Sequence, residues 1–258
     1  MYTLGIDIGS TTSKCVVLKD GKSIVTSSLF TGGIGTSAPD AVLKEALSQS
    51  RLSQSDIAAT SATGYGRNRY DGADYCVSEL TCHALGAHLT FPSVRTIIDI
   101  GGQDAKVISL GADGKMQNFL MNDKCAAGTG RFLDVMANIL QINIGDLENY
   151  AALSASPASI SSTCTVFAES EVISQLANGV ATTDLVAGIC MSVAGRVAAL
   201  AKRLTIYPDV CMSGGVAQNG GVRLALEKAI GQHILFSENA QLCGAIGAAF
   251  YAYQKASG

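Results

Sequence analysis

A short motif that occurs twice constrains the fold of this chain more than any other feature. Ile6-Asp7-Ile8-Gly9 recurs 92 residues later as Ile98-Asp99-Ile100-Gly101. After each copy, a polar turn leads into an apolar run that ends at an Asp-Gly turn, and a third, alternating run follows at 23–29 and 116–121. Because short turns between such runs join antiparallel strands, each half is predicted to begin with a three-stranded meander.

Helical patterns alternate with strand-like runs after both meanders. A strand is predicted at 210–212, just before a Gly-Gly turn. The alternation predicts an α/β fold with two domains, 1–94 and 95–240, and a final helix at about 241–258 that packs back on the first domain. No linker rich in proline or serine separates the halves, so we expect the domains to pack tightly around a cleft. The predicted helices are 41–50, 78–91, 129–140, 165–178, 182–204, 222–229 and 241–253.

The composition narrows the functional classes. With 258 residues and 48% hydrophobic side chains, the chain can bury a substantial core. A net charge of −3 gives neither a basic stripe for nucleic acid nor a polybasic segment for a membrane surface. We find no apolar run close to the ~20 residues that span a bilayer, and no leader before the first strand-like run. The expected location is the cytoplasm, without nucleic-acid or membrane partners.

Both copies of the motif place a carboxylate at a strand end, just before a turn of small residues. The first turn, from Gly9 to Lys14, offers backbone amides and hydroxyl groups that can hold phosphate oxygens. One copy alone would fit an ordinary β-turn equally well. A second hairpin, 101–103, follows Asp99 at the matching point of the other half. Two facing hairpins predict a phosphate clamp, and Asp7 and Asp99 suit Mg²⁺, which usually takes one or two carboxylates.

Further glycine turns carry a resemblance to a known superfamily. Gly214-Gly215 lies between a strand and a helix, where backbone can approach a nucleoside closely, and Gly128-Thr129-Gly130 is another small-residue turn. Together with the duplicated hairpins, these turns resemble the superfamily of actin, hexokinase and Hsp70 chaperones. The resemblance implies a duplicated actin-like (ribonuclease H-like) ATPase fold that binds Mg-ATP between two domains. It implies that Asp7 and Asp99 organise the metal and water, and that Gln103 orients the attacking water. The implied nucleotide-binding residues are Gly9, Ser10, Thr11, Thr12, Ser13, Lys14, Gly101, Gly102, Gly128, Thr129, Gly130, Gly214, Gly215, Gln218 and Gln241.

Two of the eight cysteines have an unusual setting. Cys125 and Cys164 each lie in a polar segment that leads into a predicted helix, whereas most of the others lie in apolar runs, where a thiol packs as a small hydrophobe. The positive end of a helix favours the thiolate, which is the form that binds iron. Ordinary capping cysteines, a disulfide between the two, and a zinc site are the alternatives.

The number of these cysteines bears on the kind of metal site. A 4Fe-4S cluster needs four ligands, usually thiolates, and one chain offers only two that are well placed. A symmetric homodimer would supply the missing pair. The residues therefore favour one cluster shared between two subunits.

Longer stretches resemble one family within the superfamily. Segments 122–133, 161–175, 63–67 and 78–83 closely resemble the activators of 2-hydroxyacyl-CoA dehydratases, also called archerases, which are BadF/BadG/BcrA/BcrD-type ATPases. The resemblance implies that hydrolysis of Mg-ATP to ADP drives one low-potential electron into a 2-hydroxyacyl-CoA dehydratase. It also implies that Cys125 and Cys164 bind the 4Fe-4S cluster, and that ferredoxin or flavodoxin returns the electron to the activator.

Other functions stay open. The ATPase subunit of a benzoyl-CoA reductase or of a double-cubane cluster system shares these motifs, a small-molecule kinase has the same fold, and a redox or nucleotide sensor would use both sites without catalysis. We interpret His83, His88 and His233 as structural or surface residues. We expect Glu169 and Glu171 to point away from a cluster, because nearby negative charge opposes reduction.

Overall fold

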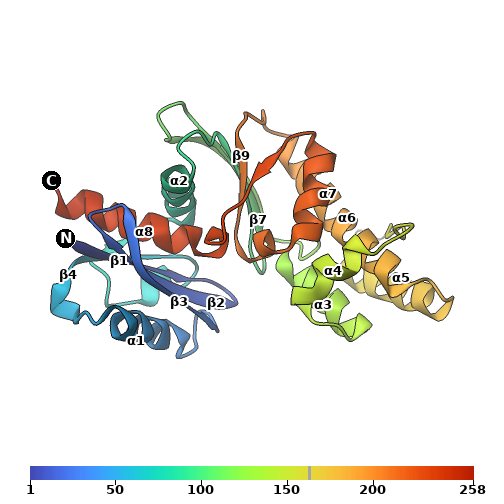
Figure 1. Cartoon of the computed structure of the whole chain (residues 1–258), viewed down its shortest axis with the longest axis horizontal. Helices are drawn as coiled ribbons and strands as arrows, with labels where there is room; N and C mark the ends of the chain where they lie inside the picture. The colour runs from blue at the N-terminus through green and yellow to red at the C-terminus, as the bar shows by residue number, and fades with distance from the viewer. Residues whose placement is uncertain (162–163) are drawn as a thin grey trace. The chain divides into compact units, whose positions relative to one another are not determined.

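The fold is described from a computed structural model that covers residues 1–161 and 164–258. By its internal contacts, the chain divides into two compact units. Unit 1 comprises Met1–Val94, Leu110–Gln117 and Ser237–Gly258, and unit 2 comprises Arg95–Ser109 and Asn118–Phe236. Figure 1 shows the sheets and the helices that pack against them.

Unit 1 is built on a five-stranded sheet in the order β3-β2-β1-β4-β5. β1 pairs antiparallel with β2, and β2 pairs antiparallel with β3, so the predicted meander is confirmed. β4 runs parallel to β1, and β5 runs parallel to β4, as expected for strands that are joined by crossover connections. The strands are β1 (Tyr2–Ile8), β2 (Thr12–Lys19), β3 (Ser23–Thr31), β4 (Ile57–Thr63) and β5 (Tyr75–Cys76).

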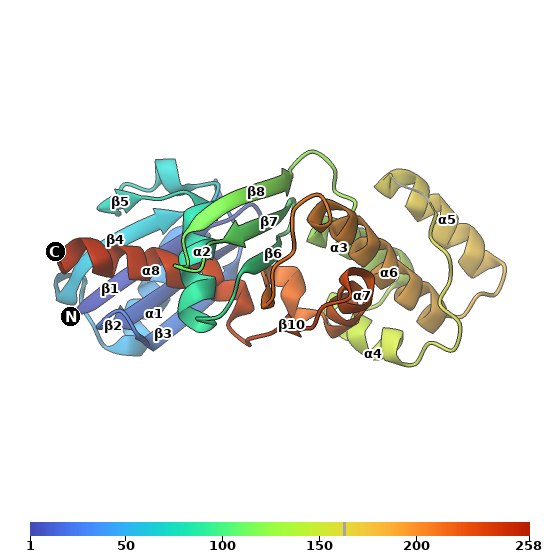
Figure 2. The same ribbon diagram turned by 90° about the horizontal axis from the view of Figure 1, so that it is seen from above.

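Helices cover both faces of this sheet. Because successive side chains of a strand point to opposite faces, Cys15 packs toward α1 (Ala38–Ser50), whereas Val16 packs toward α8 (Cys243–Ala256). Pro39 lies in the first turn of α1, where its missing N–H costs nothing. Figure 2 shows α8 along the sheet. Both faces of the sheet are therefore part of a core.

The helix α2 (Glu79–Thr90) lies against α8 with very little space between the two backbones. A Cβ atom at Gly247 would overlap the carbonyl of Cys82, and a Cβ atom at Gly86 would overlap the carbonyl of Cys243. Only glycine permits so close an approach. The contact fixes the position of α2 relative to the start of α8.

Unit 2 contains most of the second sheet, whose order is β10-β9-β6-β7-β8. β6 pairs antiparallel with β7 and parallel with β9, and β10 runs parallel to β9. This arrangement repeats that of β1 with β2 and β4. The strands are β6 (Thr96–Ile100), β7 (Ala105–Leu110), β8 (Met116–Asn122), β9 (Val210–Ser213) and β10 (Ile234–Leu235).

The helices of unit 2 agree with the predicted ones within a few residues, except that α4 was not predicted from the sequence. The longest, α6, is long and apolar enough to cross a membrane by length and composition, contrary to expectation. However, 61% of its most apolar window is buried inside the fold, as is typical of a core helix. The helices are α3 (Gly130–Leu140), α4 (Leu147–Ala152), α5 (Thr165–Ala177), α6 (Thr182–Ala201) and α7 (Gly220–Ile230).

Candidate functional site

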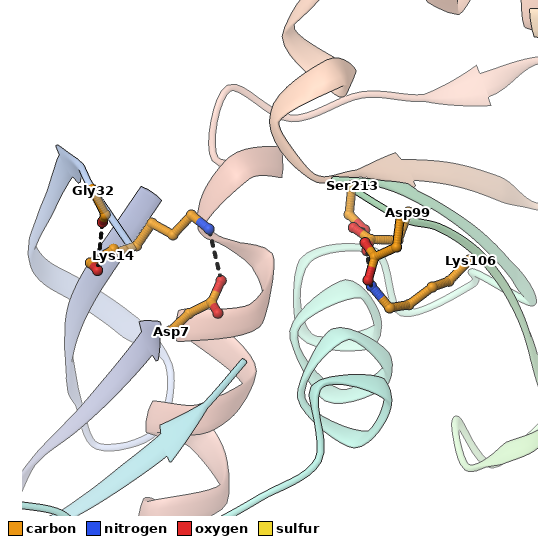
Figure 3. A network of polar contacts seen from close by, with 8 residues as sticks. Asp7, Lys14, Gly32, Asp99, Lys106 and Ser213 are labelled. Atoms are coloured by element: carbon orange, nitrogen blue, oxygen red, sulfur yellow. Dashed lines mark hydrogen bonds and ion pairs between the residues drawn. The ribbon is translucent and has the colours of Figure 1, made fainter. Parts of the chain in front are cut away.

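Asp7 lies near the end of β1, where the first hairpin begins. Asp7 is 6% exposed and lies directly across the β1–β2 pair from Lys14. The Nζ of Lys14 donates to Oδ2 of Asp7 at 3.0 Å (Figure 3). The amide of Gly9 closes the hairpin by donating to the carbonyl of Thr12 at 3.0 Å. The repeated Asp and Lys residues of the sequence are thus cross-strand partners.

Asp99 has the equivalent position in unit 2, but more of its oxygen atoms are engaged. Lys106 lies opposite it, with its Nζ 3.4 Å from Oδ2 of Asp99 and 2.8 Å from Oδ2 of Asp104. Ser213 on β9 donates its hydroxyl to Oδ1 of Asp99 at 2.8 Å (Figure 3). Asp99 is 2% exposed, and such a buried carboxylate requires this set of donors.

The duplication extends to a hydroxyl residue and a glycine beside each aspartate, a feature that was not predicted from the sequence. Thr63 lies beside Asp7 in the parallel β1–β4 pair, and Ser213 lies beside Asp99 in the β6–β9 pair. Each is followed by a glycine with positive φ: 82° at Gly64 and 86° at Gly214. A Cβ atom at either glycine would collide with Oδ1 of the adjacent aspartate. The signal in the sequence was a hydroxyl residue and a glycine directly after a strand.

The hydroxyl groups of the hairpin in unit 1 differ in whether they are available to a ligand. Ser13 is buried and donates its hydroxyl to the carbonyl of Gly32 at 2.9 Å, so this hydroxyl serves the fold. Ser10 and Thr12 are half-buried, and Thr11 is exposed. The expected role of Ser13 in holding phosphate is therefore limited to its backbone.

In unit 2, the start of α3 packs directly on the second hairpin. The amides of Gly130 and Arg131 donate to the carbonyls of Gly101 and Gly102 at 2.9 and 2.8 Å. Thr129 is buried, and its hydroxyl donates to the carbonyl of Ala126 at 2.7 Å. The amide of Thr129 donates to the same carbonyl at 3.0 Å, so both donors of Thr129 are engaged within the fold.

The remaining predicted nucleotide residues are divided between the units. Gln103 is exposed at the tip of the second hairpin, and Gly215 and Gln218 are exposed just after β9. Gly128 is buried with φ of 92°, and Gln241 is half-buried in unit 1. The joint use of both hairpins as a clamp stays a prediction.

The two selected cysteines are both exposed free thiols. Cys164 immediately precedes α5, and its carbonyl accepts the first helical hydrogen bond, from Ala168 at 2.9 Å. Cys125 is not directly at a helix start, because α3 begins only at Gly130 and a turn intervenes. Asn122 holds that turn by donating its side-chain amide to the carbonyl of Cys125 at 3.0 Å.

Most other cysteines are buried, as predicted. Cys76 is the exception, since it is exposed on β5. Burial raises the pKa of four thiols to about 12, which keeps them protonated and unreactive near neutral pH. These four are Cys15, Cys82, Cys190 and Cys211.

Side chains of α5 hold the segment that precedes Cys164. Glu171 accepts from the amide of Ser161 at 2.9 Å and from its hydroxyl at 2.9 Å. Gln175 donates to the carbonyl of Ser159 at 2.8 Å. The carboxylate of Glu171 is thus directed at Ser161. Two residues of the predicted motif, Ser162 and Thr163, lie outside the described residues.

The donor atoms can be compared with what the expected metals need. Within residues 1–161 and 164–258, no group of three or more His, Cys, Asp or Glu side chains could hold a metal ion. The exposed thiols of Cys125 and Cys164 fit half of the ligand set of a 4Fe-4S cluster. Asp7 fits a magnesium site, because it is a carboxylate near a strand end, and Gly64 lies so close to its Oδ1 that any side chain at position 64 would collide with this oxygen.

Comparisons with known proteins agree with the resemblance seen in the sequence. The chain is 58% identical over 258 residues to the (R)-2-hydroxyglutaryl-CoA dehydratase activating ATPase of Acidaminococcus fermentans, covering 100% of this chain and 99% of the relative. The structure matches that of the activator of the 2-hydroxyisocaproyl-CoA dehydratase from Clostridium difficile with bound ADPNP. The TM-score is 0.98 at 51% identity, over 100% of this chain and 96% of the other.

A more distant structure supports the fold alone. A ROK family glucokinase from Streptomyces griseus matches with a TM-score of 0.60 at 14% identity, over 98% of this chain and 100% of the other. The predicted fold class, a duplicated actin-like ATPase fold, is confirmed. The sequence profile of one ATPase family matches residues 4–252. The chain belongs to the BadF/BadG/BcrA/BcrD ATPase family.

Proposed function

We propose that this protein is an ATP-dependent activator of a 2-hydroxyacyl-CoA dehydratase, to which it delivers one low-potential electron as it hydrolyses Mg-ATP. The observation that carries the proposal is the 58% identity, over the full length, to an activating ATPase of such a dehydratase. The two exposed thiols that precede α3 and α5 are the features that an ATPase of this fold would not need for hydrolysis alone.

Cys125 and Cys164 would hold a 4Fe-4S cluster together with the same two residues of a second copy of the chain. The cluster supplies a one-electron donor of low potential. The residues of this chain do the positioning: Asn122 fixes the turn that carries Cys125, and Glu171 anchors the segment before Cys164. Both thiols are exposed, as ligands shared between two subunits must be.

The repeated hairpins would hold the nucleotide. Asp7 and Asp99 would orient a magnesium ion and its water, and Mg²⁺ would neutralise charge on the phosphates. Gln103 is exposed at a hairpin tip, where its amide would orient the attacking water. Backbone amides of the two hairpins would hold phosphate oxygens, and the turn at Gly214-Gly215 would lie against the adenosine.

The proposed partners follow from this role. The protein acts as a homodimer, receives electrons from ferredoxin or flavodoxin, and delivers them to a dehydratase that acts on a 2-hydroxyacyl-CoA. All of these proteins would work in the cytoplasm. The buried position of most of α6 supports its assignment to the core of unit 2.

The proposal can be tested by reconstitution without oxygen. The anaerobically purified protein is mixed with reduced ferredoxin, Mg-ATP and (R)-2-hydroxyglutaryl-CoA dehydratase, and formation of the enoyl-CoA is followed. We expect dehydration that requires hydrolysable ATP and is abolished by Cys164→Ala. Cys76→Ala, which changes an exposed cysteine away from both helix starts, should retain the activity. Activation that persists without ATP or without Cys164 would refute the proposal.

A small-molecule kinase is the alternative with the same fold. It is supported by fold-level matches alone, such as that to a glucokinase at 14% identity. A kinase predicts ATP turnover that needs an acceptor molecule and survives Cys125→Ala. The activator predicts ATP hydrolysis without such an acceptor, and loss of dehydratase activation in the same variant.

A further inference from the structure

His83 has a position that its sequence context did not indicate. It lies on α2, is 8% exposed, and was interpreted above as a structural or surface residue. The structure places it beside the strand end that carries Asp7. A Cβ atom built on Gly244 would lie 3.0 Å from Nε2 of His83 and 3.1 Å from Oδ2 of Asp7. The imidazole nitrogen and the carboxylate oxygen therefore border the same small space, which exists because residue 244 is glycine.

The backbone of α2 at His83 is held against α8. The carbonyl of His83 accepts a hydrogen bond from Sγ of Cys243, at 3.5 Å. One turn of α8 further on, Gly247 lies in direct contact with the carbonyl of Cys82. α2 is thus fixed against α8 on either side of the histidine. A side chain on such a fixed helix is better suited to orient a nearby carboxylate than a side chain on a loop would be.

Asp7 and its counterpart Asp99 differ in the groups that lie beside them. In unit 2, Asp99 receives a hydroxyl from Ser213 in addition to the ammonium group of Lys106. Thr63 occupies the equivalent place in unit 1. Among the residues that the structure describes, no hydrogen bond joins its hydroxyl to Asp7. The second half thus has a hydroxyl donor beside its strand-end carboxylate, and the first half has an imidazole.

We propose that His83 is a positioning residue of the magnesium–nucleotide site, one that orients the carboxylate of Asp7 through its Nε2. The proposal rests on the proposed function, in which Asp7 orients Mg²⁺ and its water. With Nε2 protonated, the imidazole donates to Oδ2, on the side where Lys14 also donates. Oδ1, which lies so close to Gly64 that a Cβ atom there would collide with it, would then be the oxygen that faces a metal-bound water.

The test compares ADP binding with and without Mg²⁺ by calorimetry, on the full-length protein. His83→Ala should weaken Mg-ADP binding by about 10-fold or more, the usual cost of losing a group that orients a metal ligand, and leave metal-free ADP binding unchanged. His83→Gln, whose amide can donate from a similar position, should recover most of the affinity, whereas His83→Asn should not. His88→Ala is the control, since this second histidine of α2 lies against the turn at Gly114.

The other possible results decide against the role of His83 or against the proposed function. Equal losses of affinity with and without Mg²⁺ would overturn the proposal, because they would show that His83 only supports the fold. Unchanged Mg-ADP affinity in all His83 variants would also overturn it, while the proposed function would stand. If His83→Ala does not fold, as judged by its melting curve, the pair His83→Gln and His83→Asn decides. A wild-type protein that binds no ADP would overturn both this inference and the proposed function.

Discussion

At the scale of single residues, the two strand-end aspartates have the same place in the repeat but different surroundings. Asp99 is enclosed by Lys106 and Ser213, and the same lysine also reaches Asp104. Asp7 has Lys14 as its donor, and glycines border its carboxylate oxygens. We infer that Asp99, with both an ammonium group and a hydroxyl beside it, is held more firmly than Asp7.

Lys106 provides a stability test of this difference. Lys106→Met leaves two buried carboxylates without their shared cation, and breaking such a buried pair typically costs about 3–5 kcal/mol of unfolding free energy. Urea denaturation measures the loss. Lys115→Met is the matched control, because Lys115 is 85% exposed in its pair with Asp113 and should change stability by less than about 0.5 kcal/mol. Similar effects of the two substitutions would contradict the account.

Thiol labelling tests the assignment of the cysteines. In cluster-free protein at pH 8, iodoacetamide should modify Cys76, Cys125 and Cys164, which are exposed. The buried thiols should stay unlabelled, because burial raises the pKa of four of them to about 12. In anaerobic protein that contains the cluster, only Cys76 should react. Mass spectrometry identifies the labelled sites, and equal labelling of Cys164 in both preparations would argue against its role as a ligand.

At the scale of helices and strands, the sequence predicted most of the fold because its signals were local. The repeated Asp-x-Gly turns predicted the antiparallel hairpins, and the helical pattern at 41–50 predicted α1. Helix α4 was missed, because its six residues are too few to show a helical period.

The site itself was only partly predictable from the sequence. Aspartates and cysteines could be selected by residue type and position. The place of His83 could not, because it depends on the contact of α2 with α8, which are far apart in the chain. Cys125 was expected in a polar segment that leads into a helix at 129–140, and α3 does begin at Gly130, after a turn that includes Gly128 with φ of 92°.

Helix α5 carries a prediction about the retention of the cluster. Glu171→Ala removes the acceptor that holds Ser161, so the segment before Cys164 loses an anchor. We expect iron to be lost to a chelator about 10-fold faster, as for other groups that orient metal ligands. Absorbance of the released iron complex measures the rate. Glu169→Ala, on the same helix, should behave as wild type, and an equal effect of both variants would show that only the charge of α5 matters.

At the scale of the whole molecule, the chain combines two features that are separate in sequence. One is the duplicated hairpin with its aspartate, which occurs once in each unit. The other is the pair Cys125 and Cys164, which are both exposed and both in unit 2. A glucokinase at 14% identity matches this chain in fold alone, so the fold by itself does not identify the function. The pair of exposed cysteines is the feature that makes this ATPase a candidate electron donor.

The central claim is that two chains share one cluster through Cys125 and Cys164. The most direct test is to count iron and acid-labile sulfide in protein purified without oxygen, together with the molar mass in solution. The account predicts about four iron atoms and four sulfides for every two chains, and almost none in Cys164→Ala. A colourless wild-type protein that is fully active, or full iron content in Cys164→Ala, would contradict it.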